Sequence, residues 1–205
     1  MKILLKNNMS LALVFVGVAG LANLVASYLI VSLYPVRETA ADIVLDRIPF
    51  VLGMGYVADV VTMLAGGLLL WLIYKGGEQF RLRALYSVGA MYLMRALLIP
   101  LTPLGNAHGS LGYPSLFTLF IEIEGMFPSG HTGLVVVIYL LVDKLRYPLL
   151  KKLALLLVIA EIASLLLARG HYSIDIVGGI MIGYLAVLWG RNFLESNLLD
   201  IIGYG

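Results

Sequence analysis

Two short segments of the sequence combine residue types that suit phosphoryl-group chemistry. They read Phe127-Pro-Ser-Gly-His-Thr132 and Arg169-Gly-His-Tyr-Ser-Ile-Asp175. His171 and Asp175 are four residues apart, so on a helix the carboxylate faces the imidazole and can accept a hydrogen bond from one ring nitrogen. The other ring nitrogen then stays basic, as a nucleophile that attacks phosphorus requires.

The first segment predicts a binding site for a phosphate group. A proline before Ser129 and Gly130 marks a helix start, where several backbone N–H groups lack an intrahelical partner and attract anions. Glycine also lets a ligand approach the backbone closely. Arg95 and Arg169 can add bidentate contacts to phosphate oxygens. We therefore expect these four residues to bind the phosphate.

Together these residues predict transfer of a phosphoryl group or phospho-headgroup at a membrane surface. His171 attacks phosphorus and forms a phosphohistidine, while His131 donates a proton to the departing lipid oxygen. His131 then deprotonates the incoming water or alcohol. A zinc site formed by His131, His171 and Asp175 is an alternative, but a third strong ligand with suitable spacing is missing. We therefore expect no metal and no cofactor.

The composition places this chemistry in an integral membrane protein. Of the 205 residues, 61% are hydrophobic and 13% are charged, and the mean hydropathy is +0.98. Soluble domains carry roughly 25% charged residues. The net charge of +2 provides no basic surface for nucleic acid, so we expect no such partner. The absence of cysteine excludes disulfides and thiolate catalysis.

Apolar runs predict an all-α bundle of six transmembrane helices, in a single domain over residues 1–205. They lack the alternation that is typical of an outer-membrane barrel. The segment Pro114–Met126 is too short to span and is predicted to lie in the interface before the fourth helix. Small residues in Ala65-Gly66-Gly67 and Gly178–Gly183 predict close helix packing. The six runs are Leu11–Tyr34, Leu52–Tyr74, Ala84–Leu104, His131–Leu145, Leu153–Ala168 and Tyr172–Gly190.

The basic residues predict the orientation of the bundle. Ten of the 14 lysines and arginines, including every lysine, fall on the side of the N-terminal tail and of the loops after the second and fourth helices. The positive-inside rule makes that side cytoplasmic, and both termini with it. All three histidines fall on the opposite side. We therefore expect an active site on the extracytoplasmic face, in the plasma membrane.

The two histidine segments resemble the type 2 phosphatidic acid phosphatase superfamily and, within it, the sphingomyelin synthase-like branch. That branch has an Arg-rich stretch, then Tyr-Leu-Tyr-Arg, Leu-Pro, Ser-Gly-His-Thr and His-Tyr-Thr-x-Asp. The resemblance covers roughly residues 45–190. The corresponding segments here are Arg81-Leu-Arg83, Met91-Tyr-Leu-Met-Arg95, Ile99-Pro100, Ser129-Gly-His-Thr132 and His171-Tyr-Ser-Ile-Asp175.

The resemblance implies six helices and a catalytic triad made of Asp175 and the two motif histidines. It also implies headgroup or entrance roles for Tyr92, inside the second motif, and Asp46, in an echo of the branch's Leu-Pro-Asp motif. Glu122 and Glu124, in the interfacial segment, are expected near the same entrance. The implied substrate is a membrane phospholipid or lipid phosphate, with a diacylglycerol-like lipid or water as acceptor. A homo-oligomer is left open.

Other features leave a lipid phosphate phosphatase as the nearest alternative. Phe127-Pro128 resembles the phosphatase branch, and the synthase branch's Cys-Gly-Asp is missing. Conversely, the chain lacks the Arg-Pro dipeptide of the phosphatases. It has Ser164-Leu165 where those proteins have Ser-Arg, and Arg169 is the candidate replacement for that arginine.

A transporter is the remaining alternative, because Arg95, Asp59 and Glu161 fall inside predicted helices. Transport predicts polar residues spread through the membrane thickness on several helices, whereas here they gather at one end. We therefore favour an enzyme and interpret Asp59 and Glu161 as hydrogen-bonded packing residues.

Overall fold

The computed structural model describes residues 9–107 and 125–202, and this part of the chain is helical without any strand. Two short 3-10 turns, η1 (Leu45–Arg47) and η2 (Ile99–Leu101), lie in the connections at one end. The α-helices of the described part are α2 (Met9–Leu33), α3 (Met54–Lys75), α4 (Glu78–Leu98), α5 (Gly130–Leu141), α6 (Pro148–Leu167) and α7 (Ser173–Ile202).

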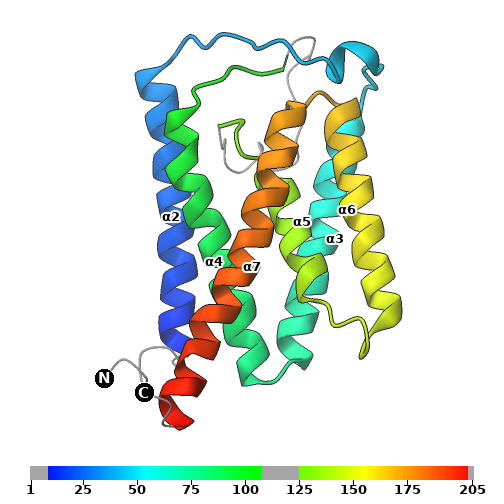
Figure 1. Ribbon diagram of the computed structural model, residues 1–205. Helices are drawn as coiled ribbons and strands as arrows, with labels where there is room; N and C mark the ends of the chain where they lie inside the picture. The colour runs from blue at the N-terminus through cyan, green and yellow to red at the C-terminus, as the bar shows by residue number, and fades with distance from the viewer. Residues whose placement is uncertain (1–8, 108–124, 203–205) are drawn as a thin grey trace.

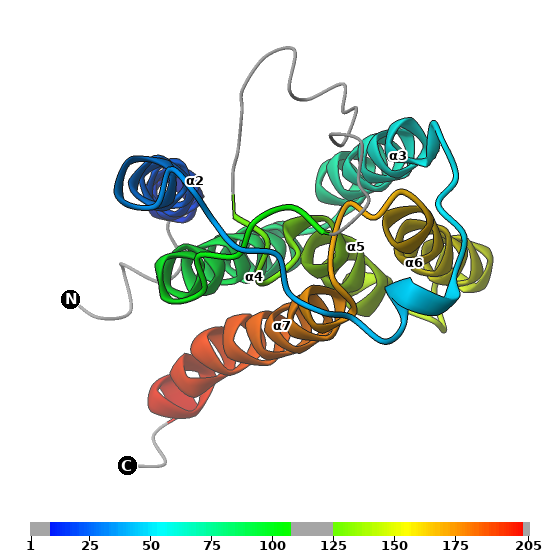
Figure 2. The same ribbon diagram turned by 90° about the horizontal axis from the view of Figure 1, so that it is seen from above.

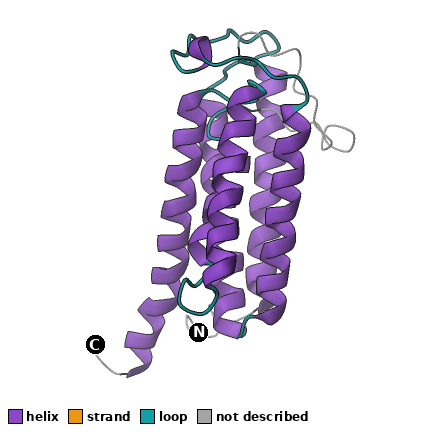
Figure 3. Cartoon of the chain, turned by 90° about the vertical axis from the view of Figure 1, so that its right-hand side faces the viewer, coloured by secondary structure: helices purple, strands orange, loops and turns teal. Residues whose placement is uncertain are grey.

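The helices lie side by side as an elongated bundle, with connections at both ends (Figures 1 and 3). Seen from above, α2 packs on α4, α7 lies along one side of α4 and α5, and α3 and α6 pack together beside α5 (Figure 2). The main apolar core joins α4, α5 and α7 through buried residues such as Met91, Val137 and Ala186. The starts of α3, α5 and α7 share one end of the bundle, opposite the start of α2 and the end of α7 (Figure 1).

The predicted helices are all present among the described residues, but several of their ends differ from prediction. Helix α4 begins at Glu78 rather than Ala84, because Arg81 is used at the helix junction, where its Nε donates to the carbonyls of Ile73 and Gly76 at 3.0 Å each. Helix α5 ends at Leu141 rather than Leu145. Beyond it, Asp143 Oδ1 accepts the backbone N–H groups of the next turn and stabilises a non-helical conformation.

Four of the described helices, α2, α3, α4 and α7, are long and apolar enough to cross a membrane. Helix α5 is apolar but has only 12 residues. Helix α6 has 20 residues and includes Lys151, Lys152 and the buried Glu161. The all-helical membrane bundle is thus supported, whereas a count of six spans remains a prediction.

Close packing of α5 on α7 depends on glycine. A Cβ added to Gly179 would lie 2.7 Å from the carbonyl oxygen of Ser129, and one added to Gly183 would lie 2.8 Å from that of Gly133. The predicted close packing of this run is therefore confirmed. The prediction was wrong for Gly66 and Gly67, because a Cβ at either position would meet nothing within 4 Å.

Candidate active site

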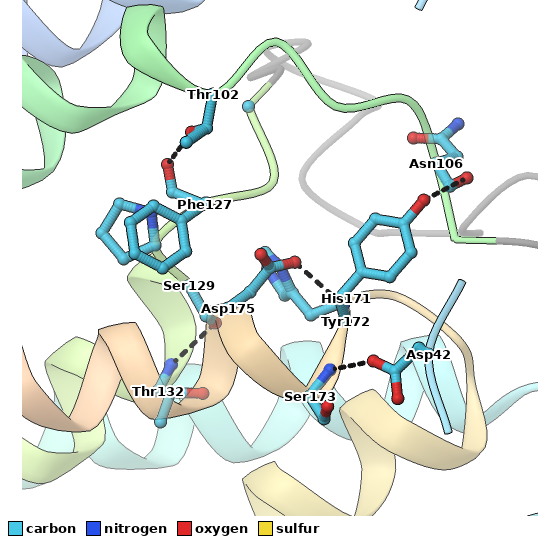
Figure 4. Close-up of polar contacts among 12 residues, drawn as sticks. Asp42, Thr102, Asn106, Phe127, Ser129, Thr132, His171, Tyr172, Ser173 and Asp175 are labelled. Atoms are coloured by element: carbon cyan, nitrogen blue, oxygen red, sulfur yellow. Dashed lines mark hydrogen bonds and ion pairs between the residues drawn. The ribbon is translucent and has the colours of Figure 1, made fainter. Parts of the chain in front are cut away.

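The start of α7 forms the first half of the candidate site. Asp175 is fully buried, and its Oδ2 lies 3.3 Å from His171 Nδ1. The same oxygen accepts the backbone N–H of Tyr172 at 2.8 Å, so the carboxylate also closes the first turn of the helix. Figure 4 shows Asp175 reaching back toward this pair. His171 is buried, with only 7% exposed. Its ring nitrogen Nδ1 faces the carboxylate of Asp175.

The start of α5 forms the second half. Ser129 is the N-cap of this helix, and its hydroxyl accepts the N–H of Thr132 at 3.3 Å (Figure 4). The backbone N–H of Ser129 donates to the carbonyl of Asp175 at 2.9 Å, which ties the two helix starts together. The capping serine is fully buried. Its hydroxyl is therefore part of the helix start that presents Gly130 and His131.

The two helix starts bring the two motif histidines together. The ring centroids of His131 and His171 are 6.2 Å apart, with an angle of 64° between the ring planes. A tetrahedral phosphate group is a few ångströms across, so this spacing suits one imidazole on each side of a phosphorus atom. His131 is the more accessible of the two, with 26% of its side chain exposed.

Arg95 packs against the loop that precedes α5 and donates hydrogen bonds to it. Its Nε donates to the carbonyl of Pro128 at 3.0 Å, and its Nη2 donates to that of Gly125 at 2.9 Å. Its Nη1 donates to Asn23 Oδ1 of α2 at 2.8 Å. A Cβ on Gly130 would come within 3.0 Å of the Arg95 Nε. The guanidinium thus shapes the loop from directly beneath the predicted phosphate site.

Three further predicted site residues, Arg169, Tyr92 and Asp46, belong to the described part of the chain. Arg169 adopts a left-handed conformation with φ of 51°, and its Nη2 donates to the carbonyl of Leu45 at 3.3 Å. Tyr92 lies one turn before Arg95 on α4 and is partly buried against the core. Asp46 is exposed and lines a cavity of about 290 Å³ together with Tyr172, next to His171 in the chain.

Several predictions concern residues outside the described part of the chain. These are Glu122 and Glu124, and with them most of the interfacial segment Pro114–Met126 and the third histidine, His108. Among the described residues, no group of three or more His, Cys, Asp or Glu side chains is arranged to hold a metal ion.

Sequence reasoning missed two residues that hold the start of α7 to the connection between α2 and α3. Asp42 Oδ2 accepts the backbone N–H of Ser173 at 2.6 Å, and its Oδ1 accepts those of Val44 and Leu45. Burial alone would raise the pKa of Asp42, but these hydrogen bonds outweigh it and lower that pKa below its usual 3.8. The position of Asp42, one of several acids in that connection, offered no signal for this role.

The second missed residue is Tyr172, whose phenol joins three segments. Its hydroxyl accepts the N–H of Ala40 at 3.0 Å and lies 3.2 Å from the carbonyls of Gly105 and Asn106 (Figure 4). The side chain is 1% exposed. Its place inside the second histidine motif was the available signal that it contributes to the site.

Comparison with known families supports the superfamily that the motifs resemble. Residues 126–192 match the family described as PAP2 superfamily C-terminal, and this segment contains both histidine motifs and the starts of α5 and α7. No curated protein matches the chain. The match covers about a third of the sequence and supports the type 2 phosphatidic acid phosphatase superfamily. With the apolar helices, it supports an integral membrane protein with a phosphatase-type or phosphotransferase-type function on lipids.

Proposed function

We propose that this protein cleaves a phosphoester bond of a membrane lipid through a phosphohistidine and transfers the phospho-headgroup to a lipid alcohol or to water. One observation carries the proposal. Two imidazoles on adjacent helix starts lie 6.2 Å apart between centroids, and one of them is backed by a buried carboxylate at 3.3 Å. Structural packing alone has no need for this arrangement.

The proposed reaction has two balanced steps. His171 directs Nδ1 at Asp175, so its Nε2 attacks phosphorus and the bond to the lipid oxygen breaks. Protonated His131 gives its proton to that oxygen, which leaves as an alcohol. Neutral His131 then takes a proton from water or a lipid alcohol, whose oxygen attacks phosphorus and releases His171. Asp175 keeps the tautomer of His171 and stabilises its positive charge throughout.

The phosphate oxygens are proposed to lie against the start of α5. Backbone N–H groups of Gly130 and its neighbours point there, and negative charge is favoured at a helix N-terminus. Three of the five N–H donors of Arg95 hold backbone and side-chain oxygens, so Arg95 contributes its charge and the shape of the loop. Ser129 contributes by capping the start of α5. Arg169 adds a positive charge two residues before His171 in the chain.

The arrangement of charge supports an extracytoplasmic site. Lys75 ends α3, and Lys151 and Lys152 lie in the first turns of α6, at the end of the bundle opposite the two histidines (Figure 1). Under the positive-inside rule, that basic end faces the cytoplasm. We therefore propose six spans, cytoplasmic termini and a catalytic face toward the outside, in the plasma membrane.

Two acceptors separate the candidate activities. The order of motifs from Arg81 to Asp175 favours a sphingomyelin synthase-like transferase, in which a diacylglycerol-like alcohol accepts the headgroup. The Phe127-Pro128 dipeptide before the phosphate loop favours a lipid phosphate phosphatase, in which water is the acceptor. The same two histidines perform both reactions.

A lipid panel tests the proposal. The purified protein is incubated with phosphatidic acid, phosphatidylcholine, phosphatidylethanolamine and phosphatidylglycerol, with and without added diacylglycerol or ceramide. Headgroup on the added acceptor identifies the transferase, and free phosphate identifies the phosphatase. If neither product is formed from any of these lipids, the result contradicts the proposed reaction and favours transport.

Substitution of the nucleophile gives the sharpest single result. His171→Ala should lower turnover by about 10⁴-fold or more, since the covalent route is lost. Unfolding temperature in detergent shows whether the variant remains folded. Retained activity in folded His171→Ala would rule out the phosphohistidine mechanism.

A further inference from the structure

Beside the site lies a second acid that the motifs do not include. Asp59, on the second turn of α3, is fully buried, and its Oδ1 lies 3.8 Å from His131 Nε2. Asp59 comes from a different helix and lies 72 positions before His131 in the chain. The bundle therefore places a carboxylate against each of the two motif histidines.

Two polar side chains, Glu161 and Thr62, lie near Asp59. Glu161 of α6 is fully buried within electrostatic reach of Asp59. The hydroxyl of Thr62, one turn further along α3, is also buried and lies near the Glu161 carboxylate. Of these two acids, Asp59 is the one whose carboxylate faces the imidazole of His131.

We propose that Asp59 is a positioning residue that orients the His131 ring and stabilises its positive charge for proton donation to the leaving alcohol. The inference rests on the proposed function and deepens it. Asp59 faces Nε2, so Nδ1 is the nitrogen directed to the substrate oxygen. The carboxylate lowers the energy of the imidazolium, which must be present when the bond to the lipid breaks. The site thus contains two acid–imidazole pairs, one for each chemical role.

Leaving-group dependence separates this role from a structural one. The full-length protein in detergent micelles is given two matched pairs of probes. One pair is dioctanoyl phosphatidic acid and para-nitrophenyl phosphate, and the other is dioctanoyl phosphatidylcholine and para-nitrophenyl phosphorylcholine. Within each pair the transferred group is the same. A nitrophenolate leaves without a proton, whereas a diacylglycerol requires one, so single-turnover release of each alcohol reports on His131.

Asp59→Asn is expected to slow diacylglycerol release by about 100-fold and nitrophenolate release by less than about five-fold. Asp59→Glu, which keeps the charge, should recover part of the loss. Two matched controls, Thr62→Val on the same helix and Glu161→Gln, should keep the wild-type ratio of the two rates. Equal slowing of both releases, no slowing of either, or a loss confined to Glu161→Gln would overturn the proposal.

A second measurement keeps the inference testable apart from the reaction. In ¹⁵N-histidine NMR spectra, with His131 assigned through His131→Gln, the His131 ring resonances should move in Asp59→Asn and stay in place in Thr62→Val. Unchanged resonances in Asp59→Asn would refute the pairing. If no probe is cleaved by wild type but the resonances move, the proposed reaction fails while the Asp59–His131 pair stands.

Discussion

The starts of α5 and α7 lie side by side, yet they are held in opposite ways. At α7, the acid that faces His171 lies four residues further along the chain, in the first turn of the helix, and it also accepts the N–H of Tyr172. At α5, the supporting groups come from other helices. Arg95 of α4 holds the preceding loop, and Asp59 of α3 faces His131.

The contact at the start of α7 is made within one segment of the chain, whereas the contacts at the start of α5 are made by several helices. His171 and Asp175 are four residues apart, so the pair itself is made within one segment of the chain. Their neighbours Tyr172 and Ser173 are in turn bonded to other segments. The geometry around His131 exists only when α3, α4 and α5 pack together. In the proposed mechanism, the nucleophile needs a fixed direction of attack, and proton transfer by His131 is sensitive to changes far along the chain. Three substitutions probe this contrast, from the largest expected effect to the smallest.

Replacing Arg95 tests the contacts at the start of α5 most severely. Arg95→Met removes the three hydrogen bonds that hold Gly125, Pro128 and Asn23, and a shift of the loop by about 1 Å costs on the order of 100-fold in turnover. Hydrogen exchange of the amides in residues 125–131 should accelerate, and those of residues 172–176 should change little. Arg95→Lys keeps the charge without the fork and should lose nearly as much. A wild-type rate in Arg95→Lys would mean that charge alone suffices.

The contact between the two halves is tested by Gly179→Ala. The added methyl would lie 2.7 Å from the Ser129 carbonyl oxygen, so α7 must move away from α5. We expect a loss of about 1–3 kcal/mol in unfolding free energy, measured by denaturation in mixed micelles. Gly66→Ala is the control, because nothing lies within 4 Å of its new methyl. It should be neutral or stabilising by up to about 1 kcal/mol. Equal effects of the two variants would contradict the close approach.

The smallest effect is expected at the cap of α7. Asp42→Asn should lower the unfolding free energy by about 1 kcal/mol at neutral pH, because the charged acceptor of the Ser173 N–H is lost. The folded pKa of Asp42 is lowered, so this stabilisation is complete above the ordinary value of 3.8 and fades as the pH falls through the folded pKa. Wild type and variant should therefore converge in acid. The exposed Asp46→Asn should stay within about 0.5 kcal/mol of wild type, and a constant gap across pH at Asp42 would refute the charge argument.

The sequence predicted the contacts between nearby residues but not those between distant helices. Long apolar runs predicted each described helix, and the spacing of His171 and Asp175 predicted their contact, because both signals act within a few turns of chain. The partners of Arg95 were not predictable in this way. The sequence suggested a phosphate for its charge, whereas the structure gives it the carbonyls of a loop 30 and 33 residues away. Backbone acceptors carry no sequence signature.

Asp59 shows the same limit for side chains. A lone aspartate in an apolar run is consistent with a packing residue, and nothing nearby in sequence marks its partner. Only the packing of α3 beside α5 places it 3.8 Å from His131. Helix ends were also missed where polar side chains of Arg81 and Asp143 compete for backbone groups, because apolar content says little about such competition.

The Asn23–Arg95 hydrogen bond has a consequence for how the chain can be divided. Helix α2 sits at the margin of the bundle and resembles a dispensable membrane anchor, since much of its surface faces outward. The buried side-chain amide of Asn23 in this helix nevertheless accepts a hydrogen bond from Arg95. A chimera that exchanged α2 for a foreign anchor would leave that arginine short of an acceptor inside the bilayer. The matched residues 126–192 contain neither Arg95 nor Asn23, so the support for the loop before α5 comes from outside that segment.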